Sequence, residues 1–465
     1  MRKGGAYRTR CWAAIFAACG LAMPLHGQTR TLRIVTYNIE ADVNTNAPMP
    51  GLIAPVDDPA NTQAGGVLEG IGEELVGNDR AQPLDILALE ETTSNPLTVT
   101  PIVNGLNAFY GVPGMYANSP FQAGESGNNP NVGNGPNALV YNTRTVQLLA
   151  STPVDPPGGK GNLGSASGEY REVMRYEFAP AGVVPSPVNE FFIYVSHYKS
   201  GTGSVNEQDR LGEAQIIRND EANNLATGAR VLYVGDYNVE SSDEPMYQTI
   251  LSNAAPEGVV RGQGFDPLNL SNNPDITWSV STTNAGILAM LTEHGYDLEF
   301  RDDLQMMTSN VCFGAPGGLM YVSGTYHAFA NSGAIPYGGS VDDGSNPALV
   351  DQLATNGPVF INASQLYFDL TEASDHLPVV ADYSVPMPVP VIAHFQVTGS
   401  NLVFTVNNAV TNGAYTLLGS GDAGLAVSNW NVVTTKTASG SSFLLAVTNG
   451  WNPAAPGQFY LLREQ

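Results

Sequence analysis

Cysteine is nearly absent from this chain. Three cysteines occur in 465 residues, and two of them, Cys11 and Cys19, lie close to the N-terminus. If that segment is removed on export, Cys312 alone remains, so the mature chain cannot hold an intrachain disulfide. A disulfide scaffold is therefore excluded. We expect Cys312 to be a small buried side chain, because no catalytic cysteine signature surrounds it.

Basic side chains are scarce as well. The chain has 19 Lys and Arg residues against 43 Asp and Glu, a formal net charge of −24. Loss of the N-terminal segment, which carries Arg2, Lys3, Arg8 and Arg10, would make the balance more acidic still. Such a surface repels polyanions and argues against a sequence-specific nucleic-acid binder, which needs a basic stripe. It does not exclude a nuclease, because bound cations can offset an acidic cluster.

Long apolar runs are missing too. The apolar run from Cys11 to Met23 is shorter than the roughly 20 residues that a transmembrane helix needs. It follows a basic segment and precedes a small residue before Gln28, which is the pattern of a secretory signal peptide. We therefore expect residues 1–27 to be a signal peptide. The mature protein is expected to be secreted, extracellular or periplasmic, without stable membrane insertion.

What remains divides into two parts of different composition. Residues 31–385 mix β-prone runs with a few helical patterns, such as Glu207–Leu225, which favours packed sheets covered by helices. Residues 386–392 are proline-rich and read as a stiff linker. Residues 393–465 hold short alternating strands, which predict a small all-β, sandwich-like module. The module lacks a catalytic cluster, and its expected roles are attachment, sorting, or contact with a cell surface or carbohydrate.

Within the larger part, polar side chains follow the apolar runs. Asp236 and Asn238 come directly after a strand-like run, and period-two alternation would place both on one side. A carboxylate beside an amide can position a water and contact a phosphoryl oxygen. The alternative is a simple Asp/Asn turn after a strand. Asn38 ends the first strand-like run, where its alternative is again an amide that caps a turn.

Two adjacent glutamates follow the apolar run Ile86–Leu89. An inward-facing carboxylate at this place, Glu90 or Glu91, should be paired or bound to a metal. Because neighbouring side chains on a strand alternate, we expect one of the two to face solvent. The residues alone leave open which glutamate is the functional one.

Two histidines could move protons. His197 ends an apolar run and His376 follows Asp375, but a single histidine is more often a satisfied polar residue than a catalyst. Asp303 lies inside an apparent strand, and its alternative is a salt bridge to Arg301.

Taken together, six such segments suit metal-assisted hydrolysis of a phosphate ester, which needs charge neutralisation and an activated water. In chain order they are Thr36–Glu40, Leu89–Thr92, Ser196–Ser200, Gly235–Asn238, Arg301–Leu304 and Ser374–Val379. This series resembles the endonuclease/exonuclease/phosphatase superfamily, which includes pancreatic-type deoxyribonucleases, bacterial sphingomyelinases and inositol-polyphosphate phosphatases. The resemblance spans about Leu32 to Val385. Two departures stand out, since Glu90 replaces the family's Gln and Leu304 replaces its aromatic residue.

The resemblance implies a four-layer α/β sandwich of two packed mixed sheets flanked by helices, with Mg²⁺ or Mn²⁺ as cofactor. The residues it places around the metal are Asn38, Glu91 and Asp375. The residues it makes catalytic are Asp236 and Asn238 for the water, His376 oriented by Asp303 for proton transfer, and His197 for phosphate contact. Candidate substrate contacts are Arg171, Lys199 and Asn137, whereas Arg175 is expected to form a surface ion pair.

The function expected from these residues is a secreted, metal-dependent phosphodiesterase acting on extracellular nucleic acid. One alternative is a sphingomyelinase-like hydrolase of phospholipid headgroups or a phosphatase. The lipid hydrolase would need an exposed apolar hairpin, for which Gly317–Tyr326 is the candidate. Another alternative is a non-catalytic binding protein that keeps the fold but not the chemistry. The sequence leaves the substrate and the oligomeric state open.

Overall fold

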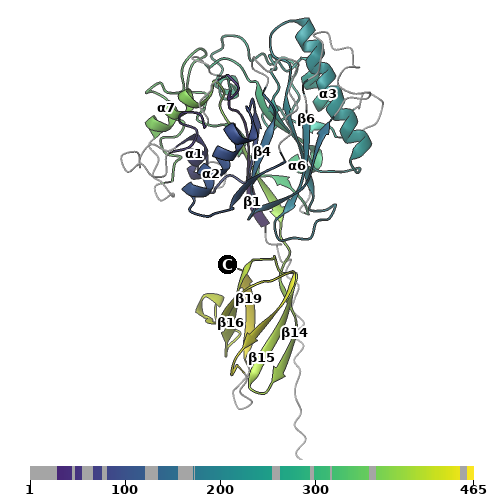
Figure 1. The fold of residues 1–465 in the computed structure, drawn as a ribbon, viewed down its shortest axis with the longest axis vertical. Coiled ribbons are helices and arrows are strands. Elements are labelled where there is room, and N and C mark those ends of the chain that lie inside the picture. Colours follow the sequence, from purple (N-terminus) through teal and green to yellow (C-terminus); the bar gives the residue numbers. More distant parts are fainter. Residues whose placement is uncertain are drawn as a thin grey trace, which may run out of the picture.

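The computed structural model describes residues 29–43, 48–54, 66–75, 81–120, 135–154, 171, 173–253, 262–293, 298–314, 317–354, 363–450 and 458–464 (Figure 1). The predicted signal peptide, residues 1–27, lies outside the described residues. Within the described ranges, none of the helices combines the length and the apolar character needed to cross a membrane.

The first sheet brings distant segments together at one edge. Its seven strands follow the order β11-β13-β1-β2-β4-β3, with β12 also paired to β13. β1 runs parallel to β2 and antiparallel to β13, so that Thr36 lies opposite both Ala88 and Val379. The ends of β1 and β2 therefore meet the start of β13. The strands are β1 (Thr29–Asn38), β2 (Ile86–Glu90), β3 (Tyr116–Asn118), β4 (Ala138–Asn142), β11 (Met320–Tyr321), β12 (His327–Ala328) and β13 (Val379–Pro386).

The second sheet also brings distant segments of the chain together at one edge. Its order is β5-β6-β7-β8-β10-β9. β7 is parallel to β8 and β10 is antiparallel to it, which places His197 and Asp303 opposite Asp236 on either side. The strands are β5 (Val146–Val154), β6 (Val173–Pro180), β7 (Phe191–His197), β8 (Val231–Asp236), β9 (Gly264–Phe265) and β10 (Asp303–Thr308).

The two sheets pack face to face. β1 and β2 contact β7, β8 and β10 across the interface. Alternate residues such as Ile34, Ile193 and Val234 fill the space between the sheets with one apolar cluster, which we call the inter-sheet core. Because side chains alternate along a strand, the next inward positions are Asn38 at the end of β1 and Asp236 at the end of β8. The polar residues therefore continue the inner faces at one end of the sandwich.

Helices cover the outer faces. In Figure 1, α1, α2 and α7 lie on one side and α3 on the other. On α2, Ile102, Leu106 and Phe109 are buried at spacings of four and three, which is the apolar stripe of a helix that packs on a sheet. The four-layer sandwich predicted from the sequence is thus confirmed. The helices are α1 (Val67–Glu73), η1 (Asn95–Val99), α2 (Thr100–Phe109), α3 (Ser204–Asn224), α4 (Pro245–Leu251), α5 (Ala285–Leu288), α6 (Ser309–Cys312) and α7 (Ala363–Ala373).

The C-terminal residues form a separate small β-sandwich with its own apolar core, as expected. Its two three-stranded sheets have the orders β14-β15-β18 and β17-β16-β19. β13 ends at Pro386 and β14 begins at Val391, so within the predicted linker 386–392 the residues 387–390 connect the two strands. The elements are β14 (Val391–Thr398), β15 (Asn401–Asn407), β16 (Ala414–Ser420), η2 (Val427–Asn429), β17 (Asn431–Thr437), β18 (Ser442–Val447) and β19 (Phe459–Glu464).

This module meets the sandwich at the end that is opposite to the polar strand ends (Figure 1). Val410 of the module joins the inter-sheet core, and the backbone N–H of Thr411 donates to the carbonyl of Gly182 at 3.1 Å. β1 starts beside the end of β13 and runs for 10 residues to Asn38. At about 3.3 Å per residue, this strand separates the module from the polar end by roughly 30 Å.

Candidate active site

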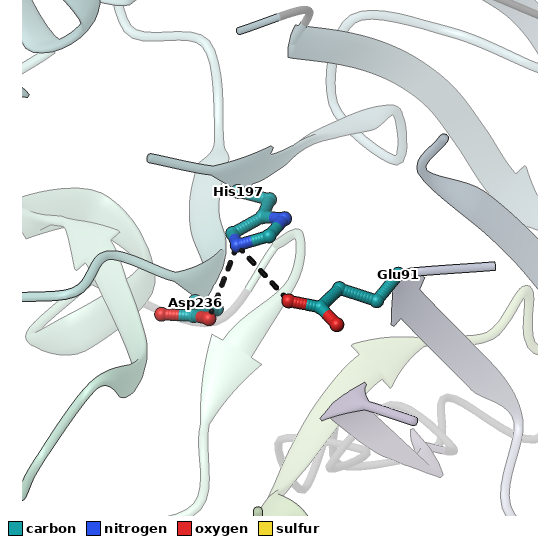
Figure 2. A group of neighbouring side chains, drawn as sticks. All are labelled: Glu91, His197 and Asp236. Carbon is teal, nitrogen blue, oxygen red and sulfur yellow. Dashed lines mark ion pairs between the residues drawn. The ribbon is translucent and has the colours of Figure 1, made fainter. Parts of the chain in front are cut away.

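Three side chains at the polar end come within the reach of one metal ion. The Nε2 atom of His197 lies 3.5 Å from Oε1 of Glu91 and 3.4 Å from Oδ2 of Asp236. One possible ligand atom from each residue lies within 4.8 Å of the other two. Figure 2 shows the two carboxylates converging on the imidazole from different strands. We call Glu91, His197 and Asp236 the candidate metal centre.

A left-handed backbone conformation delivers Glu91 to this centre. Glu90 ends β2 on its inner face, where it is 0% exposed and accepts a hydrogen bond from the hydroxyl of Thr36 at 3.1 Å. Regular alternation would turn Glu91 to the opposite face, but Glu91 has φ +54°. Its side chain is 12% exposed and reaches His197 instead. The expectation that one of the two glutamates faces solvent is therefore wrong, because the strand ends in a kink.

Hydrogen bonds fix the carboxylate of Asp236 on both sides. Its Oδ2 accepts from Nδ2 of Asn38 at 2.9 Å, and its Oδ1 accepts from the backbone N–H and from Nδ2 of Asn238, both at 2.9 Å. Gly235 is required before it, because a Cβ there would lie 1.9 Å from the carbonyl oxygen of Ser196. The Asp/Asn turn that was the alternative to a site is thus present, and it serves to orient Asp236.

His376 and Asp303 form a buried pair beside Asp236. Nδ1 of His376 donates to Oδ2 of Asp303 at 2.7 Å. Its Nε2 faces the candidate metal centre, 4.0 Å from Oδ2 of Asp236 and 3.5 Å from Nδ2 of Asn38. The alternative partner, Arg301, instead forms a two-pronged salt bridge with another aspartate at 2.7 and 3.0 Å.

The surroundings of the two histidines shift their pKa values in opposite directions. Burial alone would lower the pKa of His376, but the carboxylates of Asp303 and Asp375 outweigh burial and hold that pKa well above its usual value. Burial and the neighbouring guanidinium of Arg171 hold the pKa of His197 well below its usual value. These surroundings favour a protonated His376, which can donate a proton, and a neutral His197, which can bind a metal.

The carboxylates of the candidate metal centre are crowded. Burial and the nearby Asp42 raise the pKa of Glu91 to about 9. Burial raises the pKa of Asp236 to about 6, although His376 opposes the shift. A divalent cation would relieve both the repulsion and the desolvation. The donors are carboxylate oxygens and one imidazole nitrogen, with no thiolate, and this set fits Mn²⁺ or a Mg²⁺ that keeps several waters.

The metal set predicted by resemblance differs in part from this group. Glu91 belongs to both sets. Asn38 is one hydrogen bond away, through Asp236. The side chain of Asp375 is 36% exposed, and its Oδ1 lies 3.6 Å from Nε2 of His376. Metal binding by Asn38 and Asp375 stays a prediction, while His197 and Asp236, predicted as catalytic groups, form the candidate metal centre with Glu91.

The predicted substrate contacts are tied into the scaffold next to His197. Arg171 is buried and donates to the carbonyl of Tyr198, and burial lowers its pKa. Nδ2 of Asn137 donates to the carbonyl of Val195 at 3.2 Å. Nζ of Lys199 donates to the carbonyl of the next residue at 3.1 Å and is partly exposed. These contacts hold the end of β7, and substrate binding by the three residues stays a prediction.

Other carboxylates near His376 were missed in the sequence. Glu293 forms an isolated antiparallel bridge with the backbone of His376. Burial, and after it the negative charge of Glu293, raise the pKa of Asp302. A hydrogen bond also links the side chains of Asp302 and Glu293. Glu293 lies in an irregular segment without strand or helix periodicity, so no sequence signal pointed to it.

No family model matches the chain, and no curated protein is significantly similar to it. Several solved structures are similar at low identity. An endonuclease/exonuclease/phosphatase from Beutenbergia cavernae is 14% identical, covers 94% of this chain and 100% of its own, and gives a TM-score of 0.41.

Two further structures give similar values. The catalytic domain of human Nocturnin with bound sulfate is 15% identical, with coverages of 77% and 97% and a TM-score of 0.40. D. rerio TDP2 complexed with a single-strand DNA product is 13% identical, with coverages of 76% and 98% and a TM-score of 0.38. Likeness at this level decides nothing about activity, which has to be argued from the residues of the site.

Proposed function

We propose that the protein is a divalent-metal-dependent phosphodiesterase. One observation carries the proposal: the candidate metal centre and the His376–Asp303 pair meet at one end of the inter-sheet space, with Oδ2 of Asp236 4.0 Å from Nε2 of His376. A cation and an imidazolium beside a reacting phosphorus can together stabilise the charge that develops on the phosphoryl and leaving oxygens.

Each side chain has a task that follows from its contacts. Glu91, His197 and Asp236 would hold the cation, which neutralises charge on the phosphate when bound. Asn38 and Asn238 occupy three of the four lone pairs of the Asp236 carboxylate, so the lone pair left on Oδ2 is held in place to face either the cation or the attacking water.

His376 is the proton donor in this scheme. Asp303 accepts from Nδ1 of His376 and so leaves Nε2 as the end that faces the substrate. The raised pKa keeps a proton on that nitrogen, which can be donated to a phosphoryl oxygen or to the leaving oxygen.

For the substrate we propose extracellular nucleic acid, on the basis of the resemblance to a superfamily that includes secreted deoxyribonucleases. The lipid alternative needs an exposed apolar hairpin at Gly317–Tyr326. In this segment Leu319 and Tyr326 are buried in the inter-sheet core and Tyr321 packs partly buried against it, so few apolar side chains are left to enter a membrane. Basic residues that would form a pocket for a highly charged phosphomonoester are scarce throughout the chain.

We also propose that the protein is exported, with cleavage before Gln28. The support is the basic and apolar pattern of residues 1–27. N-terminal sequencing of protein recovered outside the cytoplasm tests this, and a mature chain that still begins at Met1 would contradict it.

A hydrolysis panel on protein beginning at Gln28 tests the proposed activity. Double-stranded DNA, RNA, sphingomyelin and bis(p-nitrophenyl) phosphate are offered with Mg²⁺, Mn²⁺ or EDTA, and His376→Ala is the control. We expect EDTA-sensitive cleavage of nucleic acid that the variant has lost. Cleavage confined to the lipid would support the headgroup hydrolase. Absence of turnover on every substrate would favour a binding protein that keeps the fold but not the chemistry.

A further inference from the structure

Thr292 binds both segments that carry the His376–Asp303 pair. It is 1% exposed and lies outside the six motifs. Its hydroxyl oxygen accepts hydrogen bonds from the backbone N–H of Asp302 at 3.1 Å and from that of Asp303 at 3.0 Å. A hydroxyl oxygen has two lone pairs, so it can accept both bonds together. The hydroxyl therefore fixes the chain at the point where β10 begins.

The backbone of Thr292 holds the other partner. Its carbonyl accepts from the N–H of Leu377, the residue after His376, at 2.7 Å. The next residue, Glu293, pairs with His376 itself as an isolated antiparallel bridge. One short segment thus contacts Asp303 through a side chain and His376 through the backbone. These contacts fix the relative position of two residues that come from different sheets.

We infer that Thr292 is a positioning residue of the proposed phosphodiesterase, acting on His376 through Asp303. The inference rests on the proposed function. The hydroxyl can be tested by itself, because valine has nearly the same shape as threonine but cannot accept hydrogen bonds. Thr292→Val leaves two buried N–H groups unpaired, and the start of β10 then relaxes away from its position. Misplacement of a catalytic pair by about 1 Å can cost on the order of a hundredfold in rate.

The test compares three variants of the full mature protein. Thr292→Val removes the hydroxyl, and Thr292→Ser keeps it. Thr308→Val is the matched control, because Thr308 is a buried threonine at the far end of β10, the strand that Asp303 opens. Its hydroxyl oxygen also accepts a backbone N–H, that of Val231 at 3.1 Å. We expect Thr292→Val to lower kcat by roughly 10- to 100-fold with little change in KM, and Thr292→Ser to restore most of it. Thr308→Val should lower the melting temperature but leave kcat within about twofold.

A double-mutant cycle separates positioning from general destabilisation. If Thr292 acts through Asp303, adding Thr292→Val to Asp303→Ala should lower kcat by less than about twofold more, because the carboxylate that the hydroxyl positions is already gone. Wild-type kcat in Thr292→Val, or an equal loss in both backgrounds, would overturn the inference.

A second readout does not depend on turnover. The Nδ1 proton of His376, hydrogen-bonded to Asp303, gives a downfield proton resonance. We expect Thr292→Val to broaden or shift this resonance, and Thr292→Ser and Thr308→Val to leave it in place. If the wild type lacks phosphodiesterase activity but the resonance responds in this way, the proposed function fails while the positioning role stands. An unchanged resonance in Thr292→Val overturns the positioning role.

Discussion

Nδ1 of His376 donates to Oδ2 of Asp303 at 2.7 Å, although 73 residues separate them along the chain. Asp303 opens β10 in one sheet, and His376 precedes β13 in the other. The bond therefore crosses between the two sheets and depends on how they pack. It also sets the orientation of the imidazole, since Asp303 accepts the hydrogen bond from Nδ1 and Nε2 is left to face the candidate metal centre.

The first prediction concerns this histidine. His376→Ala should lower kcat by about 10²- to 10⁴-fold, because both the proton donor and a positive charge beside the phosphate are lost. The measurement is steady-state hydrolysis of the best substrate in the panel, with circular dichroism to check folding. His394→Ala is the matched control, since His394 is exposed on the C-terminal module, and it should retain wild-type rates. Equal loss in both variants would count against a specific role for His376.

The second prediction separates the two adjacent glutamates. Glu91→Gln should weaken Mn²⁺ binding by at least about tenfold, because an amide supplies less charge to the cation. Glu90→Gln should bind Mn²⁺ within a few-fold of wild type. Glu90 accepts a hydrogen bond from the hydroxyl of Thr36, and an amide oxygen can accept the same bond. Calorimetric titration of metal-free protein with Mn²⁺ measures both. Weakening by Glu90→Gln alone would move the metal role to Glu90.

Much of this site could be predicted because strands alternate. Asn38, His197 and Asp236 sit at strand ends, and period two predicts that each continues an inner face. Glu91 departs from this alternation because its own backbone is left-handed, and no pattern in the sequence indicates such a conformation. Thr292 lies in an irregular segment, and its role arises from contacts with residues 10 and 11 positions away. Local periodicity carries no information about such contacts.

The helices, too, include one that the sequence predicted and one that it did not. The helix expected at Glu207–Leu225 is present as α3, Ser204–Asn224, although charged side chains such as Arg210 share its buried face with Ala214 and Ile217. The helix α2, Thr100–Phe109, went unassigned, since prolines lie near the start of both η1 and α2 and resemble loop signals. Proline is tolerated in the first turn of a helix, where its missing N–H costs nothing.

The third prediction concerns pH and a histidine outside the site. Nε2 of His327 lies 2.9 Å from both carboxylate oxygens of Glu74. Burial opposes the charge on His327, but Glu74 outweighs burial and raises the pKa of the imidazole. A raised folded-state pKa means that the pair stabilises fully below the unfolded pKa of about 6.5 and loses its effect as pH rises through the folded value.

His327→Gln should therefore lower the free energy of unfolding more at about pH 6 than at about pH 9. Urea titrations of both proteins at the two pH values measure the difference. A larger loss at the higher pH, or an equal loss at both, would show that the charge on His327 does not contribute to stability.

The fourth prediction concerns a buried ion pair. Nε of Arg33 donates to Oδ1 of Asp382 at 2.9 Å, with both side chains 1% exposed. Asp382→Ala should cost about 3–5 kcal/mol of stability, because it leaves a buried guanidinium without its carboxylate. Arg175→Ala removes a more exposed partner of Asp220, the ion pair expected from the sequence, and should cost at most about 1 kcal/mol. Chemical unfolding compares the two, and similar losses would contradict the difference expected from burial.

The last prediction concerns the C-terminal module, which meets the sandwich about 30 Å from the candidate metal centre. Val410 of the module is 3% exposed and belongs to the inter-sheet core, whereas Val432 on β17 is 63% exposed. Val410→Asp places an unpaired charge in an apolar contact and should destabilise the protein by about 2–4 kcal/mol, while Val432→Asp should change stability by less than about 0.5 kcal/mol. Neither should change kcat/KM on a soluble substrate, because the described contacts of Val410 and Thr411 lie at the other end of the sandwich from the candidate metal centre. Differential scanning calorimetry and the hydrolysis assay measure both quantities.

A wild-type melting temperature in Val410→Asp would show that the module is tethered rather than docked. A fall in kcat/KM at temperatures where the variant stays folded would show that the module communicates with the active site.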